Sequence, residues 1–176
     1  MTQLAHRIKL KPSRMAVQYF RRACGTSRFA YNWALSRWQE KYKSGEKWMS
    51  GFSLVKEFNA IKTEKFPWTS EVSKWATQKA IQDLGDAFAK FFQKKSKYPR
   101  FKKKGKSRDS FYLGAGAFSI DGKHLWVPKL GQVKMTQRVR FPGILRNVVI
   151  SREGISNYNI VLFFIVWILF NSLLDI

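Results

Sequence analysis

The sequence predicts an α+β fold, a small β-barrel with a block of helices inserted after its first strand. Three observations lead to this prediction. Residues 4–10 alternate in polarity, as in a half-buried strand, and residues 12–95 carry apolar side chains at helical spacing. Residues 111–154 hold short apolar runs separated by Gly, Asp and Pro, which is typical of strands joined by tight turns. One strand, then helices, then several strands favours a barrel with a helical insertion.

The first strand is expected to place Leu4, His6, Ile8 and Leu10 on one face. Helix signals follow it along the chain. A Ser at position 13 is a suitable N-cap for a helix that runs to about residue 24, where a Gly would end it.

Two further helices are predicted before the middle of the chain. A Thr or Ser at positions 26–27 would cap a helix over residues 28–43, which is apolar on two sides and therefore expected to be sandwiched. A shorter helix is expected over residues 54–62, before a break at Pro67.

A long amphipathic helix is expected next, starting near Thr69 or Ser70 and continuing past residue 88. Its apolar face is formed by Thr77, Ile81, Leu84, Phe88 and Phe91. Another face carries Lys74, Gln78 and Gln82, and Trp75 leans towards it. A Trp beside a Lys and an amide can stack on or wedge beside a base, although packing of Trp75 against a neighbouring helix and solvated Gln side chains are alternatives.

A basic segment, which we call the strap (residues 96–110), follows the helix. Basic side chains crowd the strap and the residues just before it, with Tyr98 and Phe101 interleaved: they are Lys94, Lys95, Lys97, Arg100, Lys102, Lys103, Lys104, Lys106 and Arg108. Like charges repel, so such a run favours a polyanion such as a phosphate backbone. A disordered, solvated linker is the alternative.

Strands are predicted after the strap. Residues 117–120 and 124–127 flank Asp121-Gly122 and should form a hairpin. Further strands are expected over residues 132–135, 138–141 and 147–151. Residues 160–170 are uninterrupted apolar sequence, shorter than a membrane span, and could be a strand, a tail anchor or an out-of-frame end.

Composition points to a polyanionic partner. The 176 residues include 33 Lys and Arg against 11 Asp and Glu, giving a formal net charge of +22. Nucleic acid is the first candidate and an acidic membrane the second. The single cysteine, Cys24, excludes an internal disulfide and a zinc site made of several cysteines. The first eleven residues lack the long apolar core of a signal peptide, so a cytoplasmic protein is expected.

Several motifs resemble the TnpB/OrfB family of insertion-sequence proteins, RNA-guided nucleases long described as transposases and related to type V CRISPR effectors. The motifs are TSRFAYNWAL at residues 26–35, KYPRFKKKGKSRDSF at residues 97–111 and DGKHLWVPKLGQVK at residues 121–134, together with the register of AIQDLGDAFAKFF. The resemblance covers about residues 4–154.

The resemblance implies a domain organisation. Residues 1–11 would be the first strand of a wedge-type barrel, and residues 12–95 a helical recognition lobe resembling a helix-turn-helix. Residues 96–110 would be the basic strap and residues 111–154 the remaining barrel strands. Beyond residue 154 the resemblance stops, and residues 155–176 are expected to be an apolar tail made of a strand and a truncated or out-of-frame end.

The resemblance also implies partners and site residues. The partners would be guide RNA and target DNA, not a membrane. Lys74, Trp75 and Gln78 match the family's reader of the motif beside the target, and Tyr112 is expected near that duplex. Arg100, Lys102, Lys103, Lys104 and Lys106 are expected to contact the nucleic-acid backbone.

The sequence departs from the family in its catalytic half. The family's nuclease half binds divalent metal through three carboxylates and structural zinc through four cysteines, whereas the acids here are scattered and no catalytic or metal-binding residue is assigned. No cofactor and no cleavage by this chain alone are therefore expected. The alternatives are a nuclease-dead, guide-dependent DNA-binding repressor, a non-functional remnant of the element, and an unrelated basic protein anchored by its tail.

Overall fold

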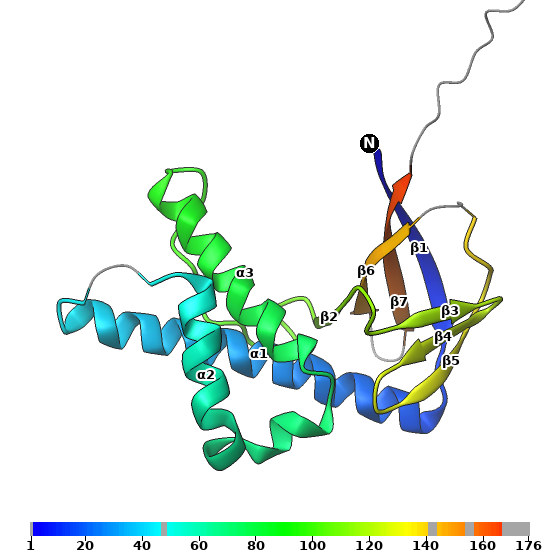
Figure 1. The fold of residues 1–176 in the computed structure, drawn as a ribbon, viewed down its shortest axis with the longest axis horizontal. Helices are drawn as coiled ribbons and strands as arrows, with labels where there is room; N and C mark the ends of the chain where they lie inside the picture. The colour runs from blue at the N-terminus through cyan, green and yellow to red at the C-terminus, as the bar shows by residue number, and fades with distance from the viewer. Residues whose placement is uncertain (1, 47–48, 141–143, 154–156, 167–176) are drawn as a thin grey trace, which may run out of the picture.

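The molecule has a helical region and a β-sheet region that lie side by side (Figure 1). A computed structural model describes residues 2–46, 49–140, 144–153 and 157–166. The helical elements are α1 (Arg14–Lys43), α2 (Gly51–Lys65), the 3₁₀ turn η1 (Pro67–Glu71) and α3 (Trp75–Phe92). The strands are β1 (Thr2–Lys11), β2 (Ser110–Gly114), β3 (Ser119–Asp121), β4 (His124–Val127), β5 (Gly131–Met135), β6 (Ile144–Glu153) and β7 (Asn157–Val166).

The strands form one antiparallel sheet of seven strands in the order β2-β6-β7-β1-β5-β4-β3. The predicted α+β class and the insertion of the helices after the first strand are confirmed. The predicted small barrel is not closed, because within the described ranges β2 and β3 remain the two edges of the sheet. Strand β1 links the two halves: it pairs with β7 over residues 2–9 and with β5 at Leu10 and Lys11.

The helix α1 is one continuous helix, so the predicted break at Gly25 is wrong. Ser13 caps its start as expected, since its hydroxyl accepts a hydrogen bond from the backbone N–H of Ala16 at 3.2 Å. Thr26 and Ser27, predicted as caps of a second helix, are instead buried inside α1. A mid-helix Gly costs about 1 kcal/mol relative to Ala, and burial of the residues on both sides of Gly25 offsets that cost.

The helix α3 begins at Trp75, later than the predicted start near Thr69 or Ser70. The hydroxyls of both residues bond locally instead: Thr69 donates to the carbonyl of Phe66 at 2.8 Å, and Ser70 donates to that of Pro67 at 2.6 Å. These bonds stabilise η1 rather than the start of α3. The predicted apolar face of α3 is confirmed, with Thr77, Ile81, Leu84 and Phe88 buried and Phe91 half-buried.

The strand predictions are largely confirmed. The hairpin turns at Asp121-Gly122 as expected, with Gly122 at a φ of +55°. The strand predicted over residues 138–141 is wrong for residues 138–140, because the backbone N–H of Arg140 donates to Nδ1 of His6 at 3.4 Å instead of joining a ladder. Phe141 lies outside the described residues. The apolar stretch forms β7 up to Val166, and the tail beyond it also lies outside them.

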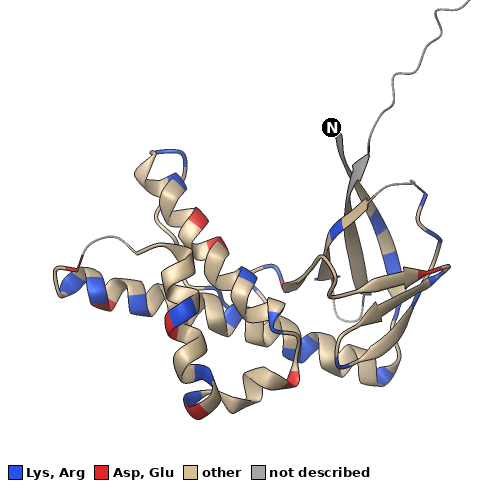
Figure 2. Cartoon of the chain, in the orientation of Figure 1, with Lys and Arg blue, Asp and Glu red and all other residues tan. Residues whose placement is uncertain are grey.

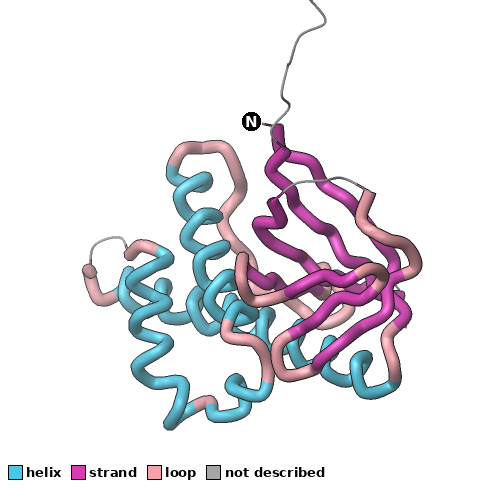
Figure 3. The backbone as a smooth tube through the Cα atoms, turned by 45° about the vertical axis from the view of Figure 1, so that its right-hand side comes forward, coloured by secondary structure: helices cyan, strands magenta, loops and turns pink. Residues whose placement is uncertain are grey.

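Two hydrophobic cores lie on either side of the middle of α1. The first half of α1 packs Tyr19, Phe20 and Cys24 into the core of the sheet. Its second half packs Leu35 and Trp38 against α2 and α3. The backbone trace shows the helices gathered beside the sheet, with α1 reaching both parts (Figure 3). The short segment from α3 to β2, which includes the strap, therefore crosses from one core to the other.

Candidate nucleic-acid interface

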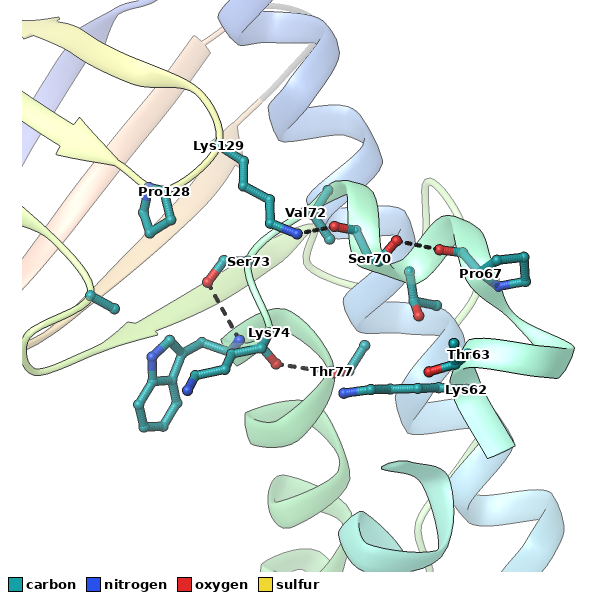
Figure 4. Close-up of a pocket in the computed structure, with 13 residues that line it drawn as sticks. Lys62, Thr63, Pro67, Ser70, Val72, Ser73, Lys74, Thr77, Pro128 and Lys129 are labelled. Atoms are coloured by element: carbon teal, nitrogen blue, oxygen red, sulfur yellow. Dashed lines mark hydrogen bonds between the residues drawn. The ribbon is translucent and has the colours of Figure 1, made fainter. Parts of the chain in front are cut away.

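A cavity of about 430 Å³ lies at the start of α3, between the helical region and the sheet (Figure 4). The lysines Lys62, Lys74 and Lys129 line it, together with Trp75 and backbone of the turn after Pro67. Lys129 reaches across from the β4–β5 turn, and its ammonium group donates to the carbonyl of Ser70. The cavity therefore has an apolar interior and a positively charged rim, which suits a base or sugar followed by phosphate.

Trp75 is half-buried and packs against strand β2, not against a neighbouring helix as in the alternative above. The indole lies directly over Gly114: a Cβ added there would approach the ring to 2.6 Å, so Gly is required for this contact. The indole also meets Tyr112 edge to face, with ring centroids 5.8 Å apart. Contact with the sheet fixes the ring while one part of it still lines the cavity.

The other two residues of the predicted reader lie on the same helical edge. Lys74 is exposed and makes no ion pair within the part of the chain described. Gln78 is half-buried one turn later, and its backbone N–H donates to the carbonyl of Lys74 at 3.2 Å. The structure thus brings Lys74 and Trp75 to one cavity and joins Trp75 to Tyr112, whereas Gln78 lies outside the cavity lining.

Lys79 is a cation beside this site that the sequence reasoning did not select. Its ammonium lies 6.0 Å from the ring centroid of Tyr112 and 2.6 Å from the carboxylate of Asp83. Burial is the largest single influence and works against its charge, but the hydrogen bond to Asp83 and the nearby charges of Asp83 and Asp86 together raise the pKa of Lys79. A second cavity, of about 410 Å³, is lined by Lys79, Tyr112, Lys102 and Asn147. The i,i+4 spacing of Lys79 and Asp83 was the available signal.

The strap is anchored to α1. The Asn32 side chain bonds both backbone groups of Lys102, donating to its carbonyl at 2.9 Å and accepting from its N–H at 2.8 Å. Pro99 is buried, and Tyr98 meets Phe88 and Phe91 edge to face at 5.5 and 5.3 Å. These contacts give the strap a defined course, in contrast to the solvated-linker alternative.

The five cations predicted for backbone contact fall into two groups. Arg100, Lys103, Lys104 and Lys106 are exposed, and none of them forms an ion pair with another described residue. Lys102 is half-buried instead, with its ammonium 4.1 Å from the ring centroid of Tyr31. Burial lowers the pKa of Lys102, and the charge of Asp83 opposes this only in part. Of these five cations, Lys102 is therefore directed inward and the other four are directed outward.

Acidic residues lie mostly on the helices, away from the strap (Figure 2). Glu57 pairs with Arg37 and Lys41, which also pair with Glu40 and Glu46 respectively. Asp109, at the end of the strap, is the exception: it pairs with Arg28 at 2.6 Å and Arg152 at 2.7 Å. Because no described acid forms an ion pair with the outward cations of the strap, these cations are left for an external anion.

The described residues hold no candidate metal site and no helix that could span a membrane. No group of three or more His, Cys, Asp or Glu side chains there is placed to hold a metal ion. No helix there is both long enough and apolar enough to cross a bilayer.

Comparison with known proteins gives a consistent result. A family model of a helix-turn-helix domain, that of the OrfB proteins of IS605 elements, matches residues 1–47. The chain is 29% identical over 154 residues to an Escherichia coli (strain K12) protein named "Putative RNA-guided DNA endonuclease InsQ", covering 85% of this chain and 37% of that protein. It is 42% identical over 71 residues to a Streptomyces pristinaespiralis "Putative RNA-guided DNA endonuclease", covering 40% and 18%. The chain thus spans well under half the length of these relatives.

Proposed function

We propose that this chain, which is homologous to the TnpB/OrfB family over its N-terminal part, binds guide RNA and target DNA and does not itself cut DNA. The relatives are named RNA-guided DNA endonucleases, so their partners are a guide RNA and a DNA target. The stretch of homology to the Escherichia coli protein spans 154 residues, 85% of this chain.

The observation that carries this proposal is the row of outward strap cations. Arg100, Lys103, Lys104 and Lys106 are exposed on a segment whose course is fixed by Asn32, and no described acid neutralises them. Binding of a nucleic-acid backbone would release counterions from its phosphates and give each of these side chains a partner. Lys102, directed at Tyr31, supports the strap from beneath in this proposal.

The cavity at the start of α3 would be the duplex-reading part of the surface. Lys74 and Trp75 line the cavity, Tyr112 contacts Trp75, and Gln78 extends the same edge by one turn. A donor pair of Lys and Gln beside a held aromatic ring suits recognition of base edges with a stacked or wedged neighbour.

Cleavage is assigned to residues other than those described here. In the family the nuclease half supplies the metal-binding carboxylates and a zinc ribbon. In this proposal divalent metal and zinc belong to that half, and the present residues contribute binding. Metal-dependent nicking of DNA by the purified chain would contradict this part of the proposal.

The experiment that tests the proposal is the salt dependence of binding. Affinity for a single-stranded RNA and for a DNA duplex is measured by fluorescence anisotropy from 50 to 200 mM salt. With four or more phosphate contacts the logarithm of affinity should fall with log salt at a slope of about −3 or steeper. A flat profile, or no binding at 50 mM salt, would remove the proposal.

The reader assignment is tested separately by the double variant Lys74→Ala, Gln78→Ala. It should flatten the differences in affinity among duplexes of different sequence while leaving affinity for single-stranded RNA nearly unchanged. The matched control is Lys90→Ala, an exposed lysine on the same helix. Equal losses for every duplex, as from a lost phosphate contact, would refute the assignment.

A further inference from the structure

A third cavity, separate from the cavity at the start of α3, gathers positive charge where α1, the strap, β6 and β7 meet. We call it the arginine pocket. It has a volume of about 220 Å³ and is lined by Arg21, Arg28, Lys104, Asp109, Arg152 and Tyr158, with buried Cys24 beside them. Arg21 and Arg28 are two turns apart on one face of α1, Lys104 comes from the strap, Asp109 precedes β2, and Arg152 and Tyr158 come from β6 and β7.

The charges in this pocket do not balance. Its four cations face a single carboxylate, that of Asp109, which pairs with Arg28 at 2.6 Å and Arg152 at 2.7 Å. Arg21 and Lys104 form no ion pair within the described ranges. The Cys24 thiol does not supply the missing negative charge, because burial raises its pKa to about 12 and keeps it protonated.

Asp109 also prepares the pocket for a ligand. Its side chain is only 11% exposed, and it fixes the positions of two guanidinium groups that are themselves mostly buried. A guanidinium has five N–H donors in a rigid plane, and each of these two groups uses few of them on Asp109. The remaining donors of Arg28 and Arg152 are therefore held in place before any ligand arrives, which lowers the entropic cost of binding.

Tyr158 provides an independent sign that a ligand is missing. It is fully buried, and its hydroxyl has no hydrogen-bond partner among the described residues. The Arg21 side chain lies close to the phenol and acts to lower its pKa, but no hydrogen bond of ordinary length and angle joins the two side chains. Burial raises the pKa of Tyr158, so the hydroxyl keeps its proton and can donate. Buried polar groups in native proteins nearly always have a partner, and an unpaired one calls for an explanation.

We propose that the arginine pocket binds one phosphate group of the nucleic-acid strand that follows the strap, with Tyr158 and Arg21 as donors. Among the described residues the Tyr158 hydroxyl has no hydrogen bond and Arg21 has no ion pair. Apart from Asp109, the residues that line the pocket offer hydrogen-bond donors, which suits a tetrahedral oxyanion. The volume is below the range of about 300–1,000 Å³ usual for drug-sized ligands, so a phosphate is favoured over a whole nucleotide. Lys104 belongs to both the pocket and the strap, which makes the two surfaces continuous.

The proposal rests on the proposed nucleic-acid binding, but its first test does not. Isothermal titration of the full chain with inorganic phosphate, against chloride at equal ionic strength, should show one saturable site. Tyr158→Phe removes only the unpaired hydroxyl and should weaken phosphate binding about tenfold without lowering the melting temperature of the free protein. Arg21→Gln should weaken it at least as much. Arg22→Gln, an equal charge change one residue along α1, is the matched control and should bind phosphate as the wild type does.

A second arm identifies the source of the phosphate. Oligonucleotides with and without a 5′-phosphate are compared in wild type and in both pocket variants. A loss of affinity in the variants for both oligonucleotides indicates an internal phosphate, and a loss only for the 5′-phosphorylated one indicates a strand end; either result supports the proposal.

Two results with the variants would overturn it. If the variants bind inorganic phosphate as the wild type does, the pocket is not the phosphate site. If the variants lose phosphate binding but bind both oligonucleotides normally, the phosphate does not come from a nucleic acid. If wild type binds phosphate but no nucleic acid, the proposed function fails and the proposal falls with it, although the pocket remains an anion site.

Discussion

Several basic side chains of the helical region have acidic partners, whereas the outward cations of the strap have none within the described residues. On the helices, Arg37 and Lys41 share three glutamates, and Lys79 is held by Asp83. On the strap, Arg100, Lys103, Lys104 and Lys106 share none within the described residues. The basic residues that give the net charge of +22 therefore do not all have the same role. Cations with internal partners contribute to the fold, and cations without them are available to bind an anion.

The largest expected effect comes from neutralising the strap. Replacing Arg100, Lys103, Lys104 and Lys106 by Gln should weaken binding to nucleic acid roughly 10³-fold near 100 mM salt and reduce the salt slope by about 3. Fluorescence anisotropy over a salt series measures both quantities.

The control for this change removes the same charge from the helices. It replaces the exposed residues Lys43, Lys56, Lys65 and Lys90 by Gln. If charge alone mattered, both quadruple variants would lose affinity equally, and the contrast between the two regions would have no functional meaning.

The next largest effect is on stability and concerns the one acid at the end of the strap. Asp109→Asn leaves Arg28 and Arg152 mostly buried without their carboxylate, which should cost about 3 kcal/mol. For a chain of this size, that cost lowers the melting temperature by about 6–12 °C. Calorimetry or circular dichroism measures it. Asp121→Asn, at an exposed hairpin turn, should leave the melting temperature unchanged; a similar fall in both variants would contradict the role of Asp109.

A smaller effect separates two neighbouring lysines of the strap. Lys103→Ala should reduce the salt slope by about 0.7–0.9 and leave stability unchanged, because the side chain is exposed. Lys102→Ala should do the reverse, since it loses a contact with Tyr31 worth about 0.5–1 kcal/mol. Equal slopes in the two variants would mean that Lys102 turns outward when nucleic acid binds.

The smallest expected effect is a pH dependence of the stability of the fold, which comes from His6 on strand β1. Burial, together with the charge of Arg140, lowers the pKa of His6 below its usual 6.5. The unfolded chain then takes up a proton more readily than the folded one, so this contribution is complete above about pH 6.5 and is lost as the pH falls below it. Melting temperatures at pH 7.5 and 5.5 should differ more in the wild type than in His6→Gln. An unchanged difference would show that other groups control the effect.

Local patterns were sufficient to predict the parts of the fold that depend on local chemistry. The alternation in β1, the apolar face of α3 and the Asp121-Gly122 hairpin were all readable, because side-chain period and turn preference are properties of neighbouring residues. The continuity of α1 was not readable. Gly25, Thr26 and Ser27 have the local character of a helix end, and only burial between two cores keeps them helical.

The candidate site divides in the same way. The basic strap and the grouping of Lys74 with Trp75 followed from charge runs and helical spacing. The inward turn of Lys102 depends on Asn32, seventy positions away in the sequence, which bonds its backbone. The arginine pocket joins α1, the strap, β6 and β7, so no single stretch of sequence contains its pattern. Which residues come together at these two places depends on contacts between distant segments, and the periodicity of the sequence does not predict such contacts.

The uninterrupted course of α1 has a mechanical consequence. A helix of thirty residues is about 45 Å long. Because α1 contributes side chains to both hydrophobic cores, it holds the two cores at a fixed distance from each other. Bending the sheet away from the helices would require breaking α1 near its middle. A nucleic-acid strand that lies across the helical region and the sheet therefore meets two surfaces whose separation is already fixed. On heating, both cores should unfold in a single cooperative transition.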